Sequence, residues 1–529
     1  MSRLWNSSRQ CLPVGSLFLP RAQSRIIRLP PSFSASSSSP CSRPGSHLPH
    51  QPRRSLLTLA IETSCDDTCV AILEKSKTGA ARLHFNEKIT SDNREHGGVH
   101  PLVAATSHTQ KLAPLVQKAL RSLPAPKAET GGAHIDSPGE EGINADGKVI
   151  LVDGQPLLRP DFVSATRGPG MMASLGKGLN LAKGLAVAWD VPLLAVNHMQ
   201  AHALTPWLVS ALERQQQQQN GDQQVRDTSE GAENQNEHHK KLEFPFLSLL
   251  VSGGHTMLVR SRSLNDHAII AKSLNIAAGD MIDKCARIVV PPEIIEAEDC
   301  NSGMYGPILE EFVFPGSRES GSYDYYYTAP ARRADEIKKF DSGYGWTLTP
   351  PLSLEGKGEE AASRYEFAGI NGQIQKLLNT RPDMVVDMRR VLGRAAMTLV
   401  FEHLTSRIVF ALQADDAKQT GNGTDTEQQG KIKTVVLSGG VASNKFLRHV
   451  VRKMLDARGY ADVEVVAPPV SLCTDNAAMI AWAGMEMYES GWRSDLGVMS
   501  LRKWPLDPNA EGGGILGASG WYKVPETKG

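Results

Sequence analysis

One short motif ends two hydrophobic segments of this chain, and it limits the possible folds more than any other feature. Residues 250–254 read Leu-Val-Ser-Gly-Gly and residues 437–440 read Leu-Ser-Gly-Gly, each following a strand-like run of apolar residues. Glycines at the end of a strand allow positive φ and let the backbone approach a phosphate, and a helix that follows adds amide donors. The repeated motif therefore favours a pair of nucleotide-binding turns, and ordinary tight turns, which also need glycine, are the alternative.

The order of the other segments indicates an α/β protein, because apolar strand-like runs alternate with longer helical patterns. The expected strands cover residues 56–61, 68–73, 161–166, 193–196, 246–251, 434–437 and 463–466. The expected helices cover residues 101–120, 198–208, 391–412, 444–458 and 476–488, with another running to Trp189. With two Ser-Gly-Gly turns and an acid-bearing first hairpin, this order favours a duplicated, actin-like nucleotide cleft. An ordinary doubly wound sheet remains the alternative.

Four polar or irregular segments interrupt this pattern. Residues 122–158 and 293–349 look like insertions, residues 215–241 are rich in Gln, Asn and His and are expected to be disordered, and residues 415–431 form a polar linker. The longest clean apolar run, residues 244–251, is too short to cross a bilayer, so we expect no membrane partner.

The first 55 residues have a composition of their own. They contain eight of the chain's 57 basic residues, all of them Arg, together with fourteen Ser and no Asp, Glu or Lys. Such an Arg-rich, Ser-rich and acid-free leader is typical of a mitochondrial presequence, although a disordered tail without an address is the alternative. We therefore expect import into the mitochondrial matrix and leave this segment out of the fold. The chain without it is acidic, because all 57 acidic residues lie there.

A pair of histidines suggests a metal site. His198 and His202 are four residues apart in a helical segment, so their imidazoles lie on one face of the helix. The metalloprotease pattern His-Glu-x-x-His is absent, because Met199 takes the place of the catalytic glutamate. Asp475, between a strand and a helix, is the candidate third ligand, and a helix N-cap is its alternative role. Without a third ligand, the two histidines would be exposed or capping residues.

Several other polar side chains lie at strand ends or on one helix face. Asp66 and Asp67 occupy the first hairpin turn, where they are either solvated or able to orient a metal or accept a proton. Asp283 is a candidate acceptor for a ribose hydroxyl, or it pairs with Arg287 four residues later. His255 follows the first Gly-Gly and is a candidate contact for phosphate or an acyl oxygen.

The remaining candidates have plainer expected roles. We expect His108 to be a satisfied surface residue, and Cys65 and Cys69 to be structural or inert. Cys473 is expected to be a small core residue.

Taken in order, eight motifs resemble those of the TsaD-type family of tRNA threonylcarbamoyladenosine transferases. The resemblance runs from Leu56 to Trp504, with insertions between the motifs. The motifs are Ile61-Glu-Thr-Ser-Cys-Asp-Asp67, Gly97-Gly-Val-His-Pro101, Arg167-Gly-Pro-Gly170, Asn197-His-Met-Gln-Ala-His202, Leu250-Val-Ser-Gly-Gly-His-Thr256, Ala277-Ala-Gly-Asp-Met-Ile-Asp-Lys284, Ser438-Gly-Gly-Val-Ala-Ser-Asn444 and Cys473-Thr-Asp-Asn476. Glu-Thr-Ser-Cys and Ser-Gly-Gly-His-Thr resemble the bacterial and mitochondrial branch of that family.

The resemblance implies an actin-like (ASKHA) fold and an acyl transfer. The expected reaction moves the threonylcarbamoyl group from threonylcarbamoyl-AMP to N6 of adenosine 37 in mitochondrial tRNAs that read ANN codons, and it releases AMP. It also implies one divalent metal ion, iron or zinc, bound by His198, His202 and Asp475. Asp66 and Asp67 would lie near the reaction centre. The residues expected to bind the donor are Leu250, Val251, Ser252, Gly253, Gly254, His255, Asp283, Gly306 and Asn444.

The chain departs from the family pattern in three places. Gln200-Ala201 replaces the usual Glu-Gly between the histidines, residues 275–280 read Asn-Ile-Ala-Ala-Gly-Asp, and Ala368 replaces a usual serine. None of these changes removes an expected ligand. The assignment of Gly306 is the least direct, because it lies inside an expanded segment.

The expected organisation has four parts. Residues 1–55 form the transit peptide, 56–192 the first subdomain, 193–475 the second, and 476–529 a helix that returns to the first subdomain and a tail. Insertions in the second subdomain are expected near residues 211–241, 293–350 and 413–432.

Three kinds of function compete at this point. The acyl transferase is expected to act on tRNA, to form a homodimer and to make local basic contacts through Lys177, Lys183 or the helix face with Arg448, Arg452 and Lys453. An actin-like kinase or a metallopeptidase is the second kind of function. A non-catalytic scaffold is the third, and the intact histidine pair and Asp475 argue against it.

Overall fold

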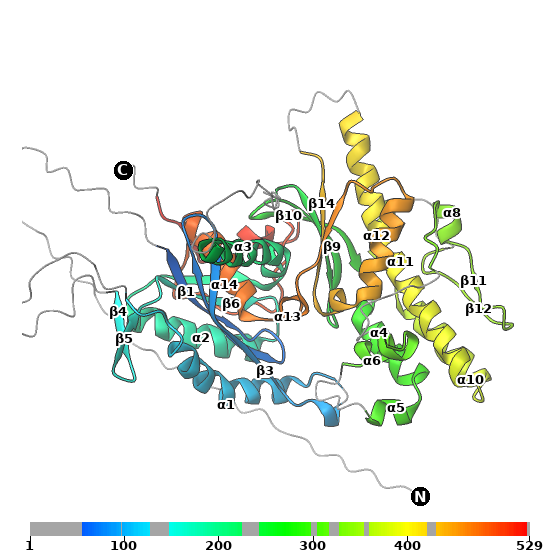
Figure 1. Cartoon of the computed structure of the whole chain (residues 1–529), viewed down its shortest axis with the longest axis horizontal. Coiled ribbons are helices and arrows are strands. Elements are labelled where there is room, and N and C mark those ends of the chain that lie inside the picture. Colours follow the sequence, from blue (N-terminus) through cyan, green and yellow to red (C-terminus); the bar gives the residue numbers. More distant parts are fainter. Residues whose placement is uncertain are drawn as a thin grey trace, which may run out of the picture. The chain divides into compact units, whose positions relative to one another are not determined.

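The computed structural model describes residues 55–96, 98–126, 148–224, 243–297, 304–316, 327–353, 359–420 and 430–525. These residues belong to one compact unit that begins at Arg53 (Figure 1). The predicted leader, up to residue 54, and parts of each predicted insertion lie outside the described residues.

A seven-stranded sheet organises the first half of the fold. Its strand order is β17-β16-β7-β6-β1-β2-β3. β1 pairs antiparallel with β2 and parallel with β6, and β6 pairs parallel with β7. The strands are β1 (Leu56–Glu62), β2 (Asp67–Lys75), β3 (Ala81–Thr90), β6 (Phe162–Gly168), β7 (Leu193–Asn197), β16 (Trp492–Ser494) and β17 (Trp521–Lys523).

A six-stranded sheet organises the second half, in the order β13-β10-β9-β8-β14-β15. β8 pairs antiparallel with β9 and parallel with β14, and β14 pairs parallel with β15. The strands are β8 (Phe246–Val251), β9 (Thr256–Ser263), β10 (Asp266–Ser273), β13 (Arg364–Tyr365), β14 (Thr434–Ser438) and β15 (Glu464–Val466).

The two sheets share one topology, which confirms the predicted duplicated, actin-like fold. In each, three strands form an antiparallel meander, and the first of them pairs in parallel with a later strand that pairs in parallel with the next. The duplication is not the one suggested by the Ser-Gly-Gly echo, because β8 and β14 are neighbours in the same sheet. By topology, the counterpart of the turn after β8 is the turn after β1.

Helices cover both faces of the first sheet. α1 (Pro101–Leu120) and α2 (Met172–Trp189) pack against β2 and β6, respectively, around one apolar core. α3 (His198–Gln224) and α14 (Ala477–Glu489) pack against each other, and α14 also contacts β1 and β2. Because both faces are covered, β1 and β6 are buried along nearly their whole length.

The core around α3 and α14 joins the two halves. It contains Phe162 and Leu194 from the first sheet and Phe246 and Val436 from the second. The strand β7, which we expected to begin the second subdomain, pairs with β6 and belongs to the first sheet. The sheet therefore continues past the expected boundary at residue 193, and the chain crosses to the second half through α3.

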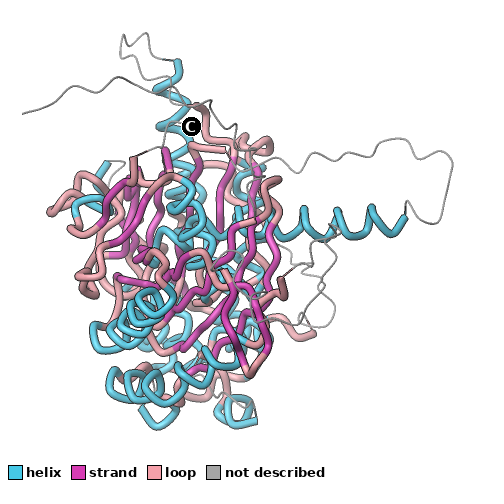
Figure 2. Tube along the Cα trace, turned by 90° about the vertical axis from the view of Figure 1, so that its left-hand side faces the viewer, coloured by secondary structure: helices cyan, strands magenta, loops and turns pink. Residues whose placement is uncertain are grey.

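One helix dominates the second half. α11 (Val386–Thr420) is long and apolar enough to cross a membrane by length and composition, but 78% of its most apolar window is buried inside the protein. The larger helices with it are α4 (Ala278–Val289), α6 (Gly306–Val313), α10 (Ala368–Thr380) and α12 (Lys445–Ala457). They cover the second sheet and share its largest core, so the apolar face of α11 is already occupied. Figure 2 shows helices packed beside the strands in a view turned by 90° from that of Figure 1.

Short elements complete the described chain. They are η1 (Arg94–His96), β4 (Val149–Val152), β5 (Gln155–Leu158), α5 (Pro292–Ala297), α8 (Arg333–Glu336), β11 (Phe340–Asp341), β12 (Thr347–Leu348), α9 (Glu359–Ala362), η2 (Gly440–Ser443), α13 (Val470–Cys473) and α15 (Gly514–Gly517).

Three predicted irregular segments contain more structure than expected. α3 continues through the glutamine run to Gln224, in agreement with the good helix propensity of glutamine. α11 extends to Thr420, and Asp415 is buried there in an ion pair of 2.7 Å with Arg260. α6, inside the predicted insertion of residues 293–349, buries Leu309 and Val313 in the main core.

Candidate functional site

The two histidines of the predicted metal site lie at the start of α3, directly after the last residue of β7. Asn197 caps this helix, because its Oδ1 accepts hydrogen bonds from the backbone N–H groups of Met199 and Gln200. The strand and the cap fix where the helix begins. His198 and His202 therefore point from one helix face into the same place, and both are buried.

Asp475 completes a compact group with these histidines. The ligand atoms of the three side chains lie within 4.8 Å of one another. Asp475 Oδ1 is 3.1 Å from His202 Nε2 and 3.6 Å from His198 Nε2. The structure thus brings together the three ligands that the sequence predicted, from the start of α3 and the junction between α13 and α14.

The capping role considered for Asp475 belongs to its neighbour. Asn476 is the N-cap of α14, and its Oδ1 accepts the backbone N–H of Met479 at 2.9 Å. The carboxylate of Asp475 is therefore turned toward the imidazoles. Cys473, just before it, is fully buried, as expected of a small core residue.

Three residues that the sequence analysis did not select contact the outer sides of the imidazoles, and one of them is Ser64, whose Oγ lies 3.3 Å from His198 Nδ1. Glu62 Oε2 lies 3.2 Å from His198 Nδ1, and Ser438 Oγ lies 3.4 Å from His202 Nδ1. Glu62 ends the apolar strand β1 and is 0% exposed. A lone acid at the end of such a strand is the one signal that sequence reasoning had available for it.

Charged His198 stabilises the charged forms of Glu62 and Asp475, and they stabilise it. Burial opposes charge on His198, but the charges of Asp475 and Glu62 outweigh it and raise the pKa of His198 to about 9. Burial likewise opposes ionisation of both acids, and the charge of His198 overcomes it and lowers the pKa of Glu62 and of Asp475. The two carboxylates therefore attract positive charge to this place, either a proton on His198 or a metal ion at its Nε2.

The two Ser-Gly-Gly turns lie side by side next to this group. Leu250 pairs with Ser438 across the parallel strands β8 and β14. Gly439 has a φ of +96°, and a Cβ there would lie 2.4 Å from the carbonyl oxygen of Val251. Only glycine fits this conformation and this close approach, so Gly439 is required by the packing of one turn on the other.

The start of α4 packs against the first turn. The N–H of Gly279 donates to the Ser252 carbonyl oxygen at 3.2 Å, and a Cβ on Gly279 would lie 2.7 Å from that oxygen. Gly253 and Gly254 are exposed, and a Cβ on either would meet no atom within 4 Å. The protein itself leaves the space beside these two glycines open.

His255 follows the first turn and feels the charges of the predicted metal ligands. Its backbone N–H donates to Ser252 Oγ at 3.0 Å. Loss of solvent, then repulsion from His198, lowers the pKa of His255, which favours a neutral imidazole.

Asp283 and Gly306, two predicted donor-binding residues, contact each other. Asp283 Oδ1 accepts the N–H groups of Tyr305 and Gly306, both at 2.9 Å. Arg287, the alternative partner considered for Asp283, contributes a favourable charge to it, and the i,i+4 ion pair of this helix joins Asp280 to Lys284. Burial raises the pKa of Asp283 despite these hydrogen bonds.

Asp66 and Asp67 have different surroundings. Burial, followed by the charge of Asp67, raises the pKa of Asp66. Asp67 forms an ion pair of 3.0 Å with Lys88, which also donates to Thr474 Oγ1 at 3.1 Å. Asp67 is thus tied to the residue before Asp475, whereas Asp66 Oδ2 accepts a hydrogen bond of 3.4 Å from Asn93 Nδ2.

The other predicted residues have structural contacts. Asn444 is the N-cap of α12 and accepts the N–H of Leu447 at 3.0 Å. His108, expected at the surface, is fully buried and bonded to Thr68 and to the carbonyl of Cys65. Burial raises the pKa of the Cys65 and Cys69 thiols, so both stay protonated.

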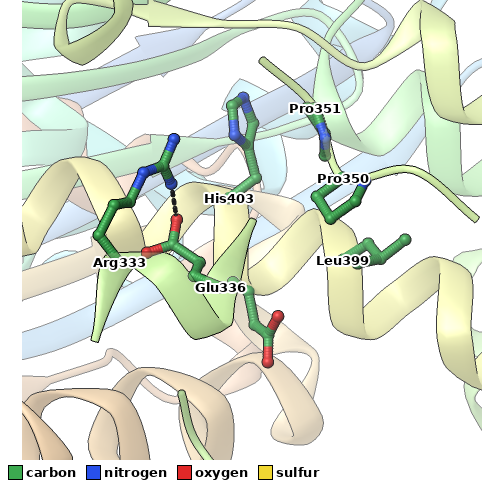
Figure 3. Close-up of a pocket in the computed structure, with 7 residues that line it drawn as sticks. Arg333, Glu336, Pro350, Pro351, Leu399 and His403 are labelled. Atoms are coloured by element: carbon green, nitrogen blue, oxygen red, sulfur yellow. Dashed lines mark hydrogen bonds and ion pairs between the residues drawn. The ribbon is translucent and has the colours of Figure 1, made fainter. Parts of the chain in front are cut away.

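Two described cavities lie in the second half, at residues other than those of the predicted site. One of about 520 Å³ lies between α11 and the segment of residues 327–341. Figure 3 shows the other, of about 10 Å³, which has room for about one water molecule. Its Arg333 is paired with Glu336, which also pairs with Arg458. These charges satisfy one another, and we assign no ligand to either cavity.

A family model matches most of the chain. The model is TsaD, described as tRNA N6-adenosine threonylcarbamoyltransferase, and it matches residues 157–216 and 228–482. It covers both histidines, both Ser-Gly-Gly turns and Asp475.

Named relatives extend the match to nearly the full length. The chain is 29% identical to the mitochondrial tRNA N6-adenosine threonylcarbamoyltransferase of Schizosaccharomyces pombe, over 90% of this chain and 91% of the relative. It is 28% identical to the tRNA N6-adenosine threonylcarbamoyltransferase of Brucella suis, over 85% of this chain and 95% of the relative.

Similar solved structures include HypF from T. kodakarensis, with a TM-score of 0.38, 13% identity and coverage of 85% of this chain and 49% of that one. Another is glucokinase from Balamuthia mandrillaris, with a TM-score of 0.30, 10% identity and coverage of 82% and 94%. At these TM-scores neither likeness carries an argument about this chain.

Proposed function

The chain belongs to the TsaD family of tRNA N6-adenosine threonylcarbamoyltransferases, and from that premise we propose how its own residues carry out the transfer. It is a transferase that modifies the N6 amino group of adenosine in tRNA. The proposed donor is threonylcarbamoyl-AMP, and the proposed acceptor is adenosine 37 of mitochondrial tRNAs that read ANN codons. The observation that carries the proposal is the group of His198, His202 and Asp475 beside the two Ser-Gly-Gly turns, the first of which exposes its glycines.

The donor set fits one divalent metal ion. Two imidazole nitrogens and one carboxylate oxygen lie within 4.8 Å of one another, and three protein ligands leave a coordination position open for substrate. Iron and zinc both accept this set. When bound, such an ion supplies a Lewis acid that stabilises negative charge on the donor's phosphate or acyl oxygen.

The glycine turns are suited to hold the adenylate. Gly253 and Gly254 present exposed backbone with space beside them, and Gly279 keeps the start of α4 against that turn. Backbone amides at such turns favour anions. We propose that Leu250–Gly254, His255 and Asn444 line the donor. Asp283 and Gly306 act there as one unit, because their hydrogen bond joins α4 to the start of α6.

Asp66 is the proposed proton acceptor of the reaction. The N6 amine attacks the carbamoyl carbon, the bond from that carbon to the phosphate oxygen breaks, and AMP leaves with the electron pair. A proton is lost from N6, and a carboxylate with a raised pKa is better suited to accept it than an ordinary one. Asp67 orients the site through Lys88 and Thr474.

The chain outside the leader has more acidic than basic residues, so its contacts to tRNA phosphates must come from local basic side chains. Among the candidates, Lys177 and Lys453 are exposed. Lys183 donates to the Val498 carbonyl, and Arg448 and Arg452 donate to backbone carbonyls of their own fold. We therefore favour Lys177 and Lys453 as phosphate contacts. A homodimer and a location in the mitochondrial matrix are also proposed, and the mitochondrial relative supports the latter.

The test is a reconstituted transfer. Purified enzyme is incubated with synthetic threonylcarbamoyl-AMP and an ANN-reading tRNA, and the digested nucleosides are analysed by mass spectrometry. We expect threonylcarbamoyladenosine with the wild type and a loss of at least tenfold with Asp66→Asn. A tRNA with guanosine at position 37 is the matched control. A metal-loaded, folded enzyme that leaves the tRNA unmodified would contradict the proposed donor.

A further inference from the structure

A fully buried carboxylate next to the metal ligands has no role in the reaction described so far. Glu62 is 0% exposed, and its Oε2 lies 3.2 Å from His198 Nδ1. Burying an ionised acid is costly unless it is paired and hydrogen-bonded. A carboxylate kept in such a place needs an explanation beyond packing.

Glu62 is held from two sides. The hydroxyl of Thr166, on β6, donates to Oε2, and the backbone N–H of Ser64, in the loop after β1, donates to Oε1. β1 and β6 are neighbouring parallel strands, so these contacts come from the rigid centre of the first sheet. The carboxylate is a fixed acceptor for His198.

The geometry of the two imidazoles shows what this acceptor does. The Nε2 atoms of both rings face Asp475 Oδ1, at 3.6 and 3.1 Å, and their Nδ1 atoms face away from it. The Nδ1 of His198 lies 3.2 Å from Glu62 Oε2 and 3.3 Å from Ser64 Oγ, and the ionised carboxylate is the stronger acceptor of the two. The Nδ1 of His202 meets the hydroxyl of Ser438. A neutral imidazole whose Nδ1–H is donated outward has its lone pair on Nε2, where an ion binds.

We infer that Glu62 is a positioning residue that accepts the Nδ1–H of His198 and so fixes the tautomer and ring orientation in which Nε2 binds the metal ion. This inference rests on the proposed metal site. It differs from a fourth ligand role, because Glu62 lies on the Nδ1 side of a ring whose Nε2 faces Asp475. It anchors the metal site to the central strands β1 and β6.

The decisive variant is Glu62→Gln. Glutamine has the same shape as glutamate, but an NH2 donor replaces one of its two acceptor oxygens. In either orientation of the amide this NH2 faces another donor, the Ser64 N–H in one and the donors from His198 and Thr166 in the other. We expect the dissociation constant for Zn²⁺, measured on the full chain by competition with a chromophoric chelator, to rise tenfold to a hundredfold. The visible spectrum of the Co²⁺-loaded protein should change as well, since the orientation of a ligand changes.

Two further variants separate positioning from charge and from folding. Thr166→Val keeps the charge of Glu62 and removes only its hydroxyl donor, so we expect a smaller, severalfold loss of Zn²⁺ affinity. Asp161→Asn removes a carboxylate that accepts the N–H of Leu57 at the opposite end of β1, and it should leave Zn²⁺ affinity within twofold of wild type. Thermal melting identifies any variant that fails to fold.

The outcomes are distinguishable. Wild-type affinity in a folded Glu62→Gln protein overturns the inference and leaves the metal site intact. A loss in Glu62→Gln with unchanged affinity in Thr166→Val and an unchanged Co²⁺ spectrum also overturns it, because the carboxylate then acts by charge alone. If the wild type itself binds neither ion, the proposed metal site fails instead.

Discussion

At the level of single residues, Glu402 on α11 is a half-buried acid whose surroundings disfavour its charge. Burial raises the pKa of Glu402 to about 7, and the nearby charge of Glu336 adds to the increase, against one hydrogen bond of 3.0 Å from the Tyr327 hydroxyl. Glu402 lines both cavities of the second half, including the one in Figure 3. Its charge is therefore a source of pH-dependent instability.

We predict that Glu402→Gln stabilises the fold at pH 8 and has little effect near pH 4.5. The pKa of Glu402 is about 7 in the folded protein and about 4.5 in the unfolded chain. Ionisation of Glu402 therefore destabilises the folded state increasingly as the pH rises from 4.5 to 7, and by a constant amount at higher pH. The pKa shift corresponds to an increase in the free energy of unfolding of the Glu402→Gln protein on the order of 3 kcal/mol at pH 8. Denaturant unfolding of both proteins across this range measures it, and an equal difference at both ends would contradict the assignment.

The metal ligands give a second prediction at this scale. His198→Ala, His202→Ala and Asp475→Ala should each abolish metal retention and transfer while leaving the fold largely intact, because three ligands on different elements share one ion. Elemental analysis and circular dichroism measure these two properties.

A second histidine pair provides the control for metal content. His96 and His100 have ring centroids 4.3 Å apart, yet they are not part of the metal-ligand cluster that the described residues contain. Replacing both by Ala should leave the metal in place. Stoichiometric metal in the His198→Ala/His202→Ala protein would rule out the assigned ligands.

At the level of elements, the contact between α4 and the first Ser-Gly-Gly turn decides the shape of the proposed adenylate site. The helix begins directly against the turn, and Gly279 allows this because it has no Cβ. A side chain at residue 279 would displace the first turn. That turn also contacts the second turn closely at Gly439, so the displacement would disturb both.

We therefore predict that Gly279→Ala weakens AMP binding at least tenfold and lowers the melting temperature, because a Cβ would lie 2.7 Å from the Ser252 oxygen. Gly372→Ala, on α10, is the matched control: a Cβ there meets no atom within 4 Å, and alanine favours a helix by roughly 0.5–1 kcal/mol. Calorimetric titration with AMP measures the effect. Equal affinities of the two variants would remove this turn from the adenylate site.

At the level of the whole molecule, the described unit contains the proposed site without the predicted leader. All the proposed site residues, from Asp66 to Asp475, lie within it. The two sheets are joined by the core around α3 and α14, and the metal ligands lie at the start of α3 and just before α14. The site therefore depends on the packing of the two halves.

We predict that residues 1–60, fused to a fluorescent reporter, direct it to the mitochondrial matrix. Eight Arg without any acid are drawn through a membrane that is negative inside, and replacing those Arg by Gln removes this force. Co-localisation with a matrix marker is the measurement, and the Gln version is the control. A cytosolic signal from the native leader would contradict this prediction. An enzyme that begins at Leu56 should remain active.

The sequence by itself determined the local features. Helical spacing placed His198 and His202 on one face, and the apolar strands and the helices between them indicated α/β. Asp475 was predicted as the third ligand from its neighbours in the motif. These features depend on residues close together in the sequence or on the order of the motifs along the chain, so they can be predicted without the tertiary structure.

Only the tertiary structure decided what lies around them. Glu62 and Ser438 reach the histidines because β1, β7 and β14 end near the start of α3, which no local pattern reveals. For the same reason the Ser-Gly-Gly echo was read as the sign of duplication, whereas the two turns are neighbours within one half. Which strand pairs with which is settled by the burial of both sheet faces between helices, and that free energy is gained only when distant segments pack.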